Sequence, residues 1–321
     1  MPSQERQDSL RAGLAKRLGD IEPAGNPRAT LHWSKILPQA VVDGITIPVE
    51  PGITVPLLLF RPKARAVPAV VGVAEGGKEM FLADRGKQIE ALLKAGVAVC
   101  LPDVRGTGET SPDSRRDAEN DENEQAVNEQ MLGETLVGKR LKDLRTVLVY
   151  LRQRRDVDGT RIGLWGESLV PVNNGRMLLD ELPLWQVGPQ IQEQGEPLGG
   201  LLALLGSLYE PGVRTVAVRR GLASYASILD DAFAYLPADA IVPGFLEAGD
   251  LADVEAALAP RPLLLEDLID GKNRLISESD LREQLRPAYE AYGGANLFVL
   301  SGHRKSQVAE RLVEGLGAGR K

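Results

Sequence analysis

The chain has 321 residues, of which 43% are hydrophobic and 26% charged, and its formal net charge is -7 at pH 7. This composition is typical of a folded globular protein with a sizeable core, and it excludes a disordered or fibrous chain. The negative charge argues against nucleic acid as the main partner, because phosphate groups are bound by clustered Lys and Arg.

The sequence predicts neither a membrane-spanning helix nor a signal peptide. No stretch approaches the roughly 18 uninterrupted apolar residues of a membrane-spanning helix, and the polar first residues lack the apolar core of a signal peptide. We therefore expect a cytoplasmic protein, unless a signal has been removed. The single cysteine, Cys100, has no partner for a disulfide within this chain and lies in an apolar run, which predicts a buried, unreactive thiol.

The first part of the chain predicts a helix followed by antiparallel strands. Residues 5–20 carry Leu10, Leu14 and Leu18 at spacings of four, which favours a short amphipathic helix. Residues 33–62 have strand character interrupted by turns, with no helix between the strands. Such strands pair antiparallel, and we expect them on one edge of a sheet.

From residue 69 onward, apolar strands alternate with helices, which predicts a buried parallel sheet built from βαβ units. Two segments do not fit this alternation. Residues 113–124 are strongly charged and are interpreted as a solvated loop, and residues 171–196 form an insertion. The expected strands span 69–73, 97–101, 161–165, 213–218, 261–265 and 296–300, and the expected helices span 79–95, 126–154, 197–208 and 305–316.

The strand at 161–165 is followed by Gly166-Glu167-Ser168, which places a hydroxyl at the end of a strand. A sharp turn there would form a nucleophile elbow, in which the serine oxygen stands clear of the sheet. The full pattern is Gly-x-Ser-x-Gly, and Val170 occupies its last position. The motif alone therefore leaves a plain turn open as the alternative.

A base and an acid are available for this serine. The chain has only two histidines, His32 and His303, which argues against a multi-histidine metal site. His303 directly follows the last expected strand, and Glu266, Asp267 and Asp270 follow the strand before it. Because the carboxyl ends of parallel strands share one edge of a sheet, Ser168, His303 and one of these carboxylates can converge.

The order Ser, Asp, His, and the strand pattern over residues 40–316, resemble the α/β-hydrolase superfamily. Within it the chain looks most like the acetyl-xylan esterase and dienelactone-hydrolase-like branch, on the basis of Asp103-Val104-Arg105-Gly106-Thr107-Gly108, Gly166-Glu167-Ser168, Asp270 and His303. The resemblance implies one domain over residues 1–321, with an extension at 1–40 and a mostly parallel sheet of about eight strands.

The same resemblance implies roles for individual residues. Ser168 would be the nucleophile, His303 the general base, and Asp270 the orienting acid, preferred over Asp267 because it lies in the turn beside Gly271. Backbone N–H groups of an oxyanion hole would come from Leu169 and from Gly76 and Gly77. The implied reaction is serine-dependent hydrolysis of small acyl or acetyl esters, including esters of carbohydrates, without cofactor or metal.

Departures from the family pattern leave alternatives open. Val170 and Pro171 interrupt the helix that should begin after Ser168, so residues 197–208 are expected to take over its packing role. The insertion 171–196 is either a lid or pocket wall over Ser168 or a surface excursion. A peptidase or amidase of the same fold, and a non-catalytic hydrolase-like binding protein, are the alternative functions.

Overall fold

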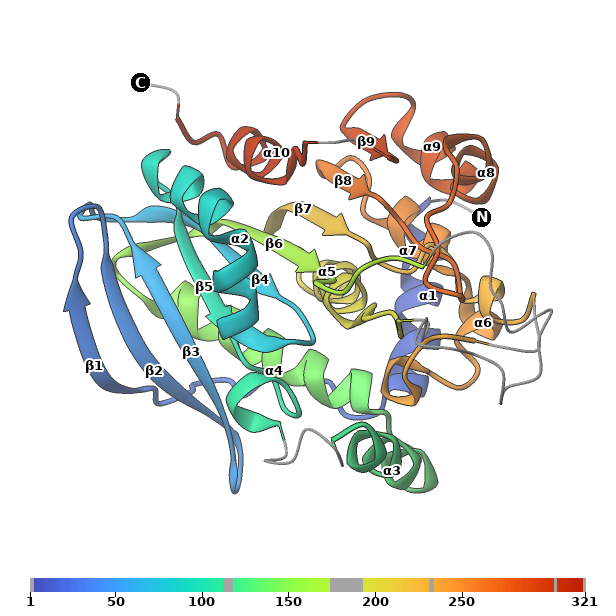
Figure 1. The fold of residues 1–321 in the computed structure, drawn as a ribbon, viewed down its shortest axis with the longest axis horizontal. Coiled ribbons are helices and arrows are strands. Elements are labelled where there is room, and N and C mark those ends of the chain that lie inside the picture. The colour runs from blue at the N-terminus through green and yellow to red at the C-terminus, as the bar shows by residue number, and fades with distance from the viewer. Residues whose placement is uncertain (1–2, 112–117, 174–192, 231–233, 303–304, 320–321) are drawn as a thin grey trace, which may run out of the picture.

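The computed structural model describes residues 3–111, 118–173, 193–230, 234–302 and 305–319. These residues contain a nine-stranded sheet in the order β1-β2-β3-β5-β4-β6-β7-β8-β9, with helices on both faces (Figure 1). The strands are β1 (Thr30–Ile36), β2 (Val41–Glu50), β3 (Ile53–Arg61), β4 (Val67–Val73), β5 (Ala98–Pro102), β6 (Val157–Glu167), β7 (Val213–Arg219), β8 (Leu263–Glu266) and β9 (Leu297–Leu300). The helices are α1 (Ser3–Leu18), α2 (Gly77–Lys94), α3 (Ala118–Met131), α4 (Leu136–Gln153), α5 (Leu198–Tyr209), α6 (Phe245–Ala248), α7 (Leu251–Ala257), α8 (Glu278–Gln284), α9 (Arg286–Tyr292) and α10 (Val308–Gly315), and short 3-10 turns include η1 (Gly108–Thr110) and η5 (Ala238–Ala240).

The pairing of the strands confirms the mixed sheet that the sequence predicts. β1, β2 and β3 pair antiparallel with one another, and β3 pairs antiparallel with β5. Every pair from β5 through β4, β6, β7 and β8 to β9 is parallel. The parallel strands therefore end at a common edge, and β6 lies in the middle of the parallel part.

Two apolar cores cover the two faces of the sheet, because successive side chains of a strand point to opposite faces. Val70 and Trp165 face α2 and α10, whereas Val71 and Leu164 face α4 and α5. Phe81 of α2 packs edge-on against Trp165, with ring centroids 4.7 Å apart. Cys100 is fully buried, as predicted, and burial raises the pKa of its thiol to about 12.

The N-terminal helix is amphipathic, as predicted. Leu10, Leu14 and Leu18 are all buried where α1 packs against α4, α6 and α7. The strand β1 adds an exposed edge to the sheet, within the residues expected to form an N-terminal extension. Trp33 of β1 lies directly over Gly44, where any side chain would collide with its ring.

Residues 126–154 do not form the single helix that the sequence predicts. Instead α3 ends at Met131 and α4 begins at Leu136. Gly133 adopts a left-handed φ of 79°, and the Thr135 side chain accepts a hydrogen bond from the Gly138 N–H as the cap of α4. A glycine with left-handed φ commonly ends a helix, and a threonine that caps the next N–H groups begins another. The charged segment at 113–124 is also not all loop, since α3 begins at Ala118.

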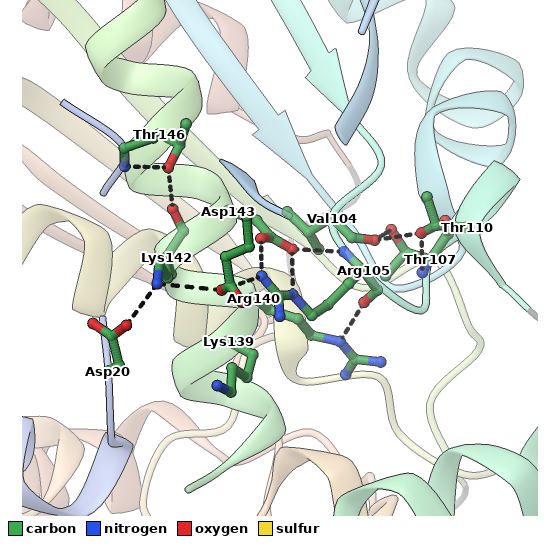
Figure 2. Close-up of polar contacts among 12 residues, drawn as sticks. Asp20, Val104, Arg105, Thr107, Thr110, Lys139, Arg140, Lys142, Asp143 and Thr146 are labelled. Carbon is green, nitrogen blue, oxygen red and sulfur yellow. Dashed lines mark hydrogen bonds and ion pairs between the residues drawn. The ribbon is translucent and has the colours of Figure 1, made fainter. Parts of the chain in front are cut away.

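The residues that follow β5 are held against α4 by a network of hydrogen bonds and ion pairs around Arg105 (Figure 2). Arg105 donates to both carboxylate oxygens of Asp143, at 2.6 and 2.9 Å, and to Glu50. Arg140 in turn donates its Nε hydrogen to the Arg105 carbonyl and pairs with the fully buried Asp239. These contacts join α4, the β5 loop and η5, so Arg105 stabilises the fold at this point.

Candidate active site

Ser168 follows the last residue of β6, at the common edge of the parallel strands. Glycines allow α5 to approach this strand end closely. A Cβ atom on Gly166 would stand 2.2 Å from the Gly199 carbonyl oxygen, and one on Gly199 would stand 2.4 Å from the Glu167 carbonyl oxygen. α5 therefore takes the packing position beside β6, as predicted from the interrupted motif (Figure 1).

The serine side chain is buried, and no described residue forms a hydrogen bond with it. Ser168 is 1% exposed, and its Oγ atom has no hydrogen-bond partner within the part of the chain that the structure describes. Its backbone N–H donates to the Arg219 carbonyl at 3.1 Å, which ties the serine to the end of β7. A buried hydroxyl without a partner is uncommon in a folded protein and often marks a site that is completed by a ligand.

The turn after Ser168 differs from the sharp elbow that the motif predicts. Ser168 is not among the described non-glycine residues with a positive φ, and α5 begins only at Leu198. The chain leaves the sheet through Leu169 and Val170, and it returns through Glu196 and Pro197. The strand and its helix are thus separated in sequence but packed together in space.

A buried charge cluster lies directly beside the serine. The Glu167 carboxylate is fully buried and accepts hydrogen bonds from Arg85 and Arg219, both at 3.0 Å, and from the Trp165 ring N–H at 3.1 Å. Arg219 also donates to Glu266 at 2.9 Å. We define Arg85, Glu167, Arg219 and Glu266 as the sub-serine cluster. It links α2, β6, β7 and β8 at the edge where Ser168 lies.

Arg220 follows Arg219 of this cluster and contacts Val170, in the segment that follows Ser168. Its backbone has a left-handed φ of 54°, which is unusual for a side-chain-bearing residue. The guanidinium donates to the Val170 carbonyl at 2.9 Å, while its buried Nε atom has no acceptor within the described ranges. Burial, and then the nearby cation Arg219, lowers the pKa of Arg220. Arg220 therefore holds a guanidinium group against the carbonyl of Val170, two residues after Ser168.

The structure places the carboxylates after β8 in different surroundings. Asp267 accepts a hydrogen bond from the Gly302 N–H at 2.8 Å, and Gly302 is the residue before His303. Glu266 accepts from the Gln307 N–H at 2.9 Å, which anchors the other side of the same loop. His303 itself lies outside the described residues. Asp267 is consequently in contact with the loop that carries the predicted base.

Asp270 is instead engaged within its own turn. Its carboxylate accepts hydrogen bonds from the Lys272 and Arg274 N–H groups and from the Arg274 guanidinium, each at 2.9 Å. This turn clamps both ends of the insertion. Asn273 donates to the Pro171 carbonyl at 3.0 Å, at the start of the insertion, and to the Glu193 carbonyl at 3.1 Å, near its end.

The predicted oxyanion donors are not equivalent. The Gly77 N–H donates to the Ala74 carbonyl at 3.1 Å, whereas no acceptor in the described part of the chain faces the Gly76 N–H. The Leu169 N–H lies 3.5 Å from a carboxylate oxygen of Glu196. Of the three, Gly76 has the N–H group that is open to a ligand.

The Gly76-Gly77 turn is held by Asp103, the first residue of the motif after β5. Asp103 is fully buried and accepts from the Lys78 N–H at 2.7 Å and from the Glu109 N–H at 2.8 Å. The Lys78 ammonium pairs with Asp103 and, at 2.8 Å, with Glu109. Gly77 needs its left-handed φ and its missing side chain, because a Cβ atom would stand 2.5 Å from Gly108.

His32 lies far from this site. It belongs to β1, the outermost strand on the antiparallel side of the sheet, where its ring Nε2 is 2.8 Å from the Thr46 hydroxyl. Four strands separate β1 from β6. Most of the insertion 171–196 falls on residues 174–192, outside the described residues, so its role as a lid stays a prediction.

Sequence reasoning missed the arginines and Glu196. Arg219 and Arg220 form a basic pair directly after a predicted strand, and that position could have indicated a place at the common edge. Arg85 and Glu196 carry no such signal. Within the described ranges, no helix is long and apolar enough to cross a membrane, and no group of three or more metal-binding side chains occurs.

Comparison with solved structures shows the α/β-hydrolase fold. A glucuronoyl esterase from Solibacter usitatus matches with a TM-score of 0.60 and 14% identity, over 97% of this chain and 92% of that one. Acetyl Xylan Esterase 1 from Thermoanaerobacterium sp. matches with a TM-score of 0.58 and 16% identity, over 98% and 93%. An acetyl xylan esterase from Paenibacillus sp. matches with a TM-score of 0.55 and 13% identity, over 98% of both chains. No protein-family model and no curated protein matches the sequence.

The chain has the α/β-hydrolase fold. The nine strands include the expected parallel sheet, and β1 accounts for the one strand beyond the predicted eight. At identities of 13 to 16%, these matches establish the fold but not the reaction that the chain catalyses. The reaction must therefore be argued from the residues at the end of β6.

Proposed function

We propose that the protein is a serine hydrolase of small carboxylic esters that acts through an acyl-enzyme intermediate. The observation that carries this proposal is Ser168: a serine that follows the central parallel strand, 1% exposed, with an Oγ atom that has no hydrogen-bond partner among the described residues. The structural neighbours named as acetyl xylan and glucuronoyl esterases support the ester class of substrate. Acetyl esters, including those of carbohydrates, are the first substrates to test.

In the proposed mechanism His303 accepts the Ser168 proton as the oxygen attacks the ester carbonyl. It then returns that proton to the departing alcohol, and a water molecule releases the acid by the reverse sequence. The backbone N–H of Gly76 donates to the oxygen on which negative charge develops. The sub-serine cluster fixes the end of β6, and with it the position of Ser168.

Asp267 and Asp270 are both candidates for the carboxylate that orients His303, and the contacts favour Asp267. Its carboxylate already holds the residue before His303, while the Asp270 carboxylate holds Arg274 and the insertion clamp. Asp267→Asn should therefore lower kcat by about 10⁴-fold, as expected for an imidazole in the wrong tautomer. Asp270→Asn should lower it much less, and the reverse ranking would return the role to Asp270.

The direct test is turnover of a short-chain p-nitrophenyl ester by the purified protein. Ser168→Ala and His303→Ala should each abolish turnover, while His32→Ala, at the far edge of the sheet, serves as the matched histidine control and should keep it. Undiminished turnover by Ser168→Ala would refute the proposal. Thermal unfolding of each variant shows whether a loss of turnover reflects a loss of fold.

A non-catalytic hydrolase-like binding protein is the second candidate, and one observation favours it. Ser168 lacks the left-handed backbone that presents the serine in a sharp elbow, and the helix does not follow it directly. Under this alternative the wild-type protein would turn over no ester and would not be labelled at Ser168 by a fluorophosphonate. Labelling that Ser168→Ala abolishes would exclude it.

A further inference from the structure

We propose that the oxyanion is bound by the first turn of α5, about thirty residues after the nucleophile, and not by the residue that follows the nucleophile. The inference rests on the proposed function and deepens it. It assigns the N–H groups of Leu198, Gly199 and Gly200 as the donors that complete the hole with Gly76. The insertion has separated the serine from the helix in sequence while leaving them adjacent in space.

The sequence at the two ends of the insertion supports this separation. Gly166-Glu167-Ser168-Leu169 leaves the sheet, and Gly195-Glu196-Pro197-Leu198 returns to it. When Ser168 is read next to Leu198-Gly199-Gly200, the combined segment is Gly-Glu-Ser-Leu-Gly-Gly. That sequence fits Gly-x-Ser-x-Gly, which the contiguous sequence fails at Val170. The missing glycine of the motif is thus present at the start of α5.

The structure brings these two segments together. Positions for a Cβ atom on Gly199 lie 2.4 and 2.7 Å from the carbonyl oxygen and nitrogen of Glu167, the residue before Ser168. The same position lies 2.5 Å from the carbonyl oxygen of Val73, at the end of β4. The first turn of α5 therefore lies where β4 and β6 end, beside the Gly76 turn and Ser168.

The N-terminus of α5 is open to an anion. Its first three N–H groups have no acceptor in the described part of the chain, and Pro197 offers no capping side chain. Its first turn carries no acidic residue, and Leu198, Gly199 and Gly200 are all buried. An α-helix concentrates about half a positive charge at such an end, and this charge favours a bound anion.

One observation apart from the helix itself indicates a ligand here, namely the buried hydroxyl of Ser168. Ser168 is 1% exposed, its Oγ atom has no hydrogen-bond partner among the described residues, and the preceding residue, Glu167, lies against the first turn of the helix. The N–H of Leu169, which would be the donor in a contiguous elbow, faces the carboxylate of Glu196 at 3.5 Å. Arg220, which donates to the Val170 carbonyl, adds a cation on the same side.

The test places a neutral hydrogen-bond acceptor on the α5 donors. Pro197→Asn frees the backbone at a position that is now helical and introduces a neutral side chain, which accepts from the N–H groups of the second or third helical residue when residue 197 adopts the extended backbone of an N-cap. Pro197→Ala is the matched control, since it also removes the ring but offers no acceptor. We expect kcat for a short-chain p-nitrophenyl ester to be about 100-fold lower in Pro197→Asn than in Pro197→Ala, as for loss of one oxyanion donor.

The thermal midpoint distinguishes this effect from damage to the fold. A cap stabilises a helix, so Pro197→Asn should unfold at or above the midpoint of Pro197→Ala. Equal kcat values in the two variants would overturn the assignment of α5 and return the role to Leu169. A lower kcat accompanied by a lower midpoint would overturn it as well, because the loss would then follow the fold.

The failure of the proposed function is distinguishable from the failure of this inference. A wild-type protein that hydrolyses no ester refutes the proposed function alone. Inorganic phosphate, followed by titration calorimetry, then serves as the anion. Binding that Pro197→Ala keeps and Pro197→Asn loses supports the α5 site, and binding that is absent or equal in the two variants overturns it.

Discussion

Two fully buried glutamates, Glu167 and Glu255, show how this protein treats charge in its interior. Both are 0% exposed. Glu167, beside the candidate nucleophile, accepts hydrogen bonds from two arginines and a tryptophan. Glu255, in α7, has no hydrogen-bond partner on either carboxylate oxygen among the residues that the structure describes. Burial is the same in the two cases, so the difference lies in the donors that the fold supplies.

The comparison indicates that Glu167 stabilises the fold through its hydrogen bonds, whereas burial of Glu255 costs stability. The three donors to Glu167, two of them cationic, replace the water that its carboxylate loses on burial. A buried carboxyl without donors keeps its proton instead, and burial together with Asp250 raises the pKa of Glu255 well above its usual range. The free energy of unfolding should respond oppositely when each glutamate is replaced.

The largest effect is expected from Glu167→Gln, which leaves Arg85 and Arg219 facing an amide. The side chain keeps its shape but loses one acceptor oxygen and its charge, and breaking a buried ion pair costs about 3 kcal/mol of unfolding free energy or more. Urea unfolding measures this loss. Glu247→Gln is the matched control, because Glu247 pairs with Arg17 while 76% exposed and should change stability by less than about 0.5 kcal/mol. Equal losses in the two variants would show that burial does not matter here.

Glu255→Met should have a smaller effect of the opposite sign. Methionine fills a similar volume and removes a buried polar group that has no partner, so we expect a gain of about 1 to 2 kcal/mol at neutral pH. The gain should depend on pH. A raised folded-state pKa means that the wild type loses stability as the pH rises above the unfolded value of about 4.3.

The pH series gives the decisive measurement for Glu255. At pH 4 the carboxyl is largely protonated in both states of the wild type, so the advantage of Glu255→Met should be smallest there and should grow toward pH 8. The groups whose charges act on Glu255 or feel its charge are Asp250, Tyr289 and Tyr292, and none of the three is changed by the substitution. A pH-independent gain would contradict the assignment of a raised pKa.

The sequence predicted the architecture well because periodicity reports burial. The parallel strands, the antiparallel edge and the role of 197–208 are confirmed, since each rests on runs of apolar residues that only one kind of layer can bury. The predicted helix over 126–154 was wrong because a single Gly133 and a capping Thr135 outweigh the surrounding helical propensity. Hydrophobic periodicity does not detect a helix break that depends on one glycine and one capping side chain.

The site was predictable only in part. The end of β6 could be located, because the position of Ser168 follows from strand order. The choice between Asp267 and Asp270 could not be made, because both follow the same strand and only their contacts with Gly302 and Arg274 separate them. The two arginine donors to Glu167 come from α2 and β7, which are distant in sequence, so no local motif predicts them.

The smallest effect is expected from Glu90→Gln, which completes the series with a glutamate that has a partner but little burial. Glu90 and Lys94 form a pair one helical turn apart in α2 at 2.6 Å, with side chains 52% and 58% exposed. Water solvates both charges in the unfolded and folded states alike, so the pair should contribute no more than about 0.5 kcal/mol. Urea unfolding in low and high salt tests this, because about 1 M salt should screen the contribution away. A loss as large as that of Glu167→Gln would mean that a charged partner alone, without burial, decides the energy, and the contrast between Glu167 and Glu255 would then need a different cause.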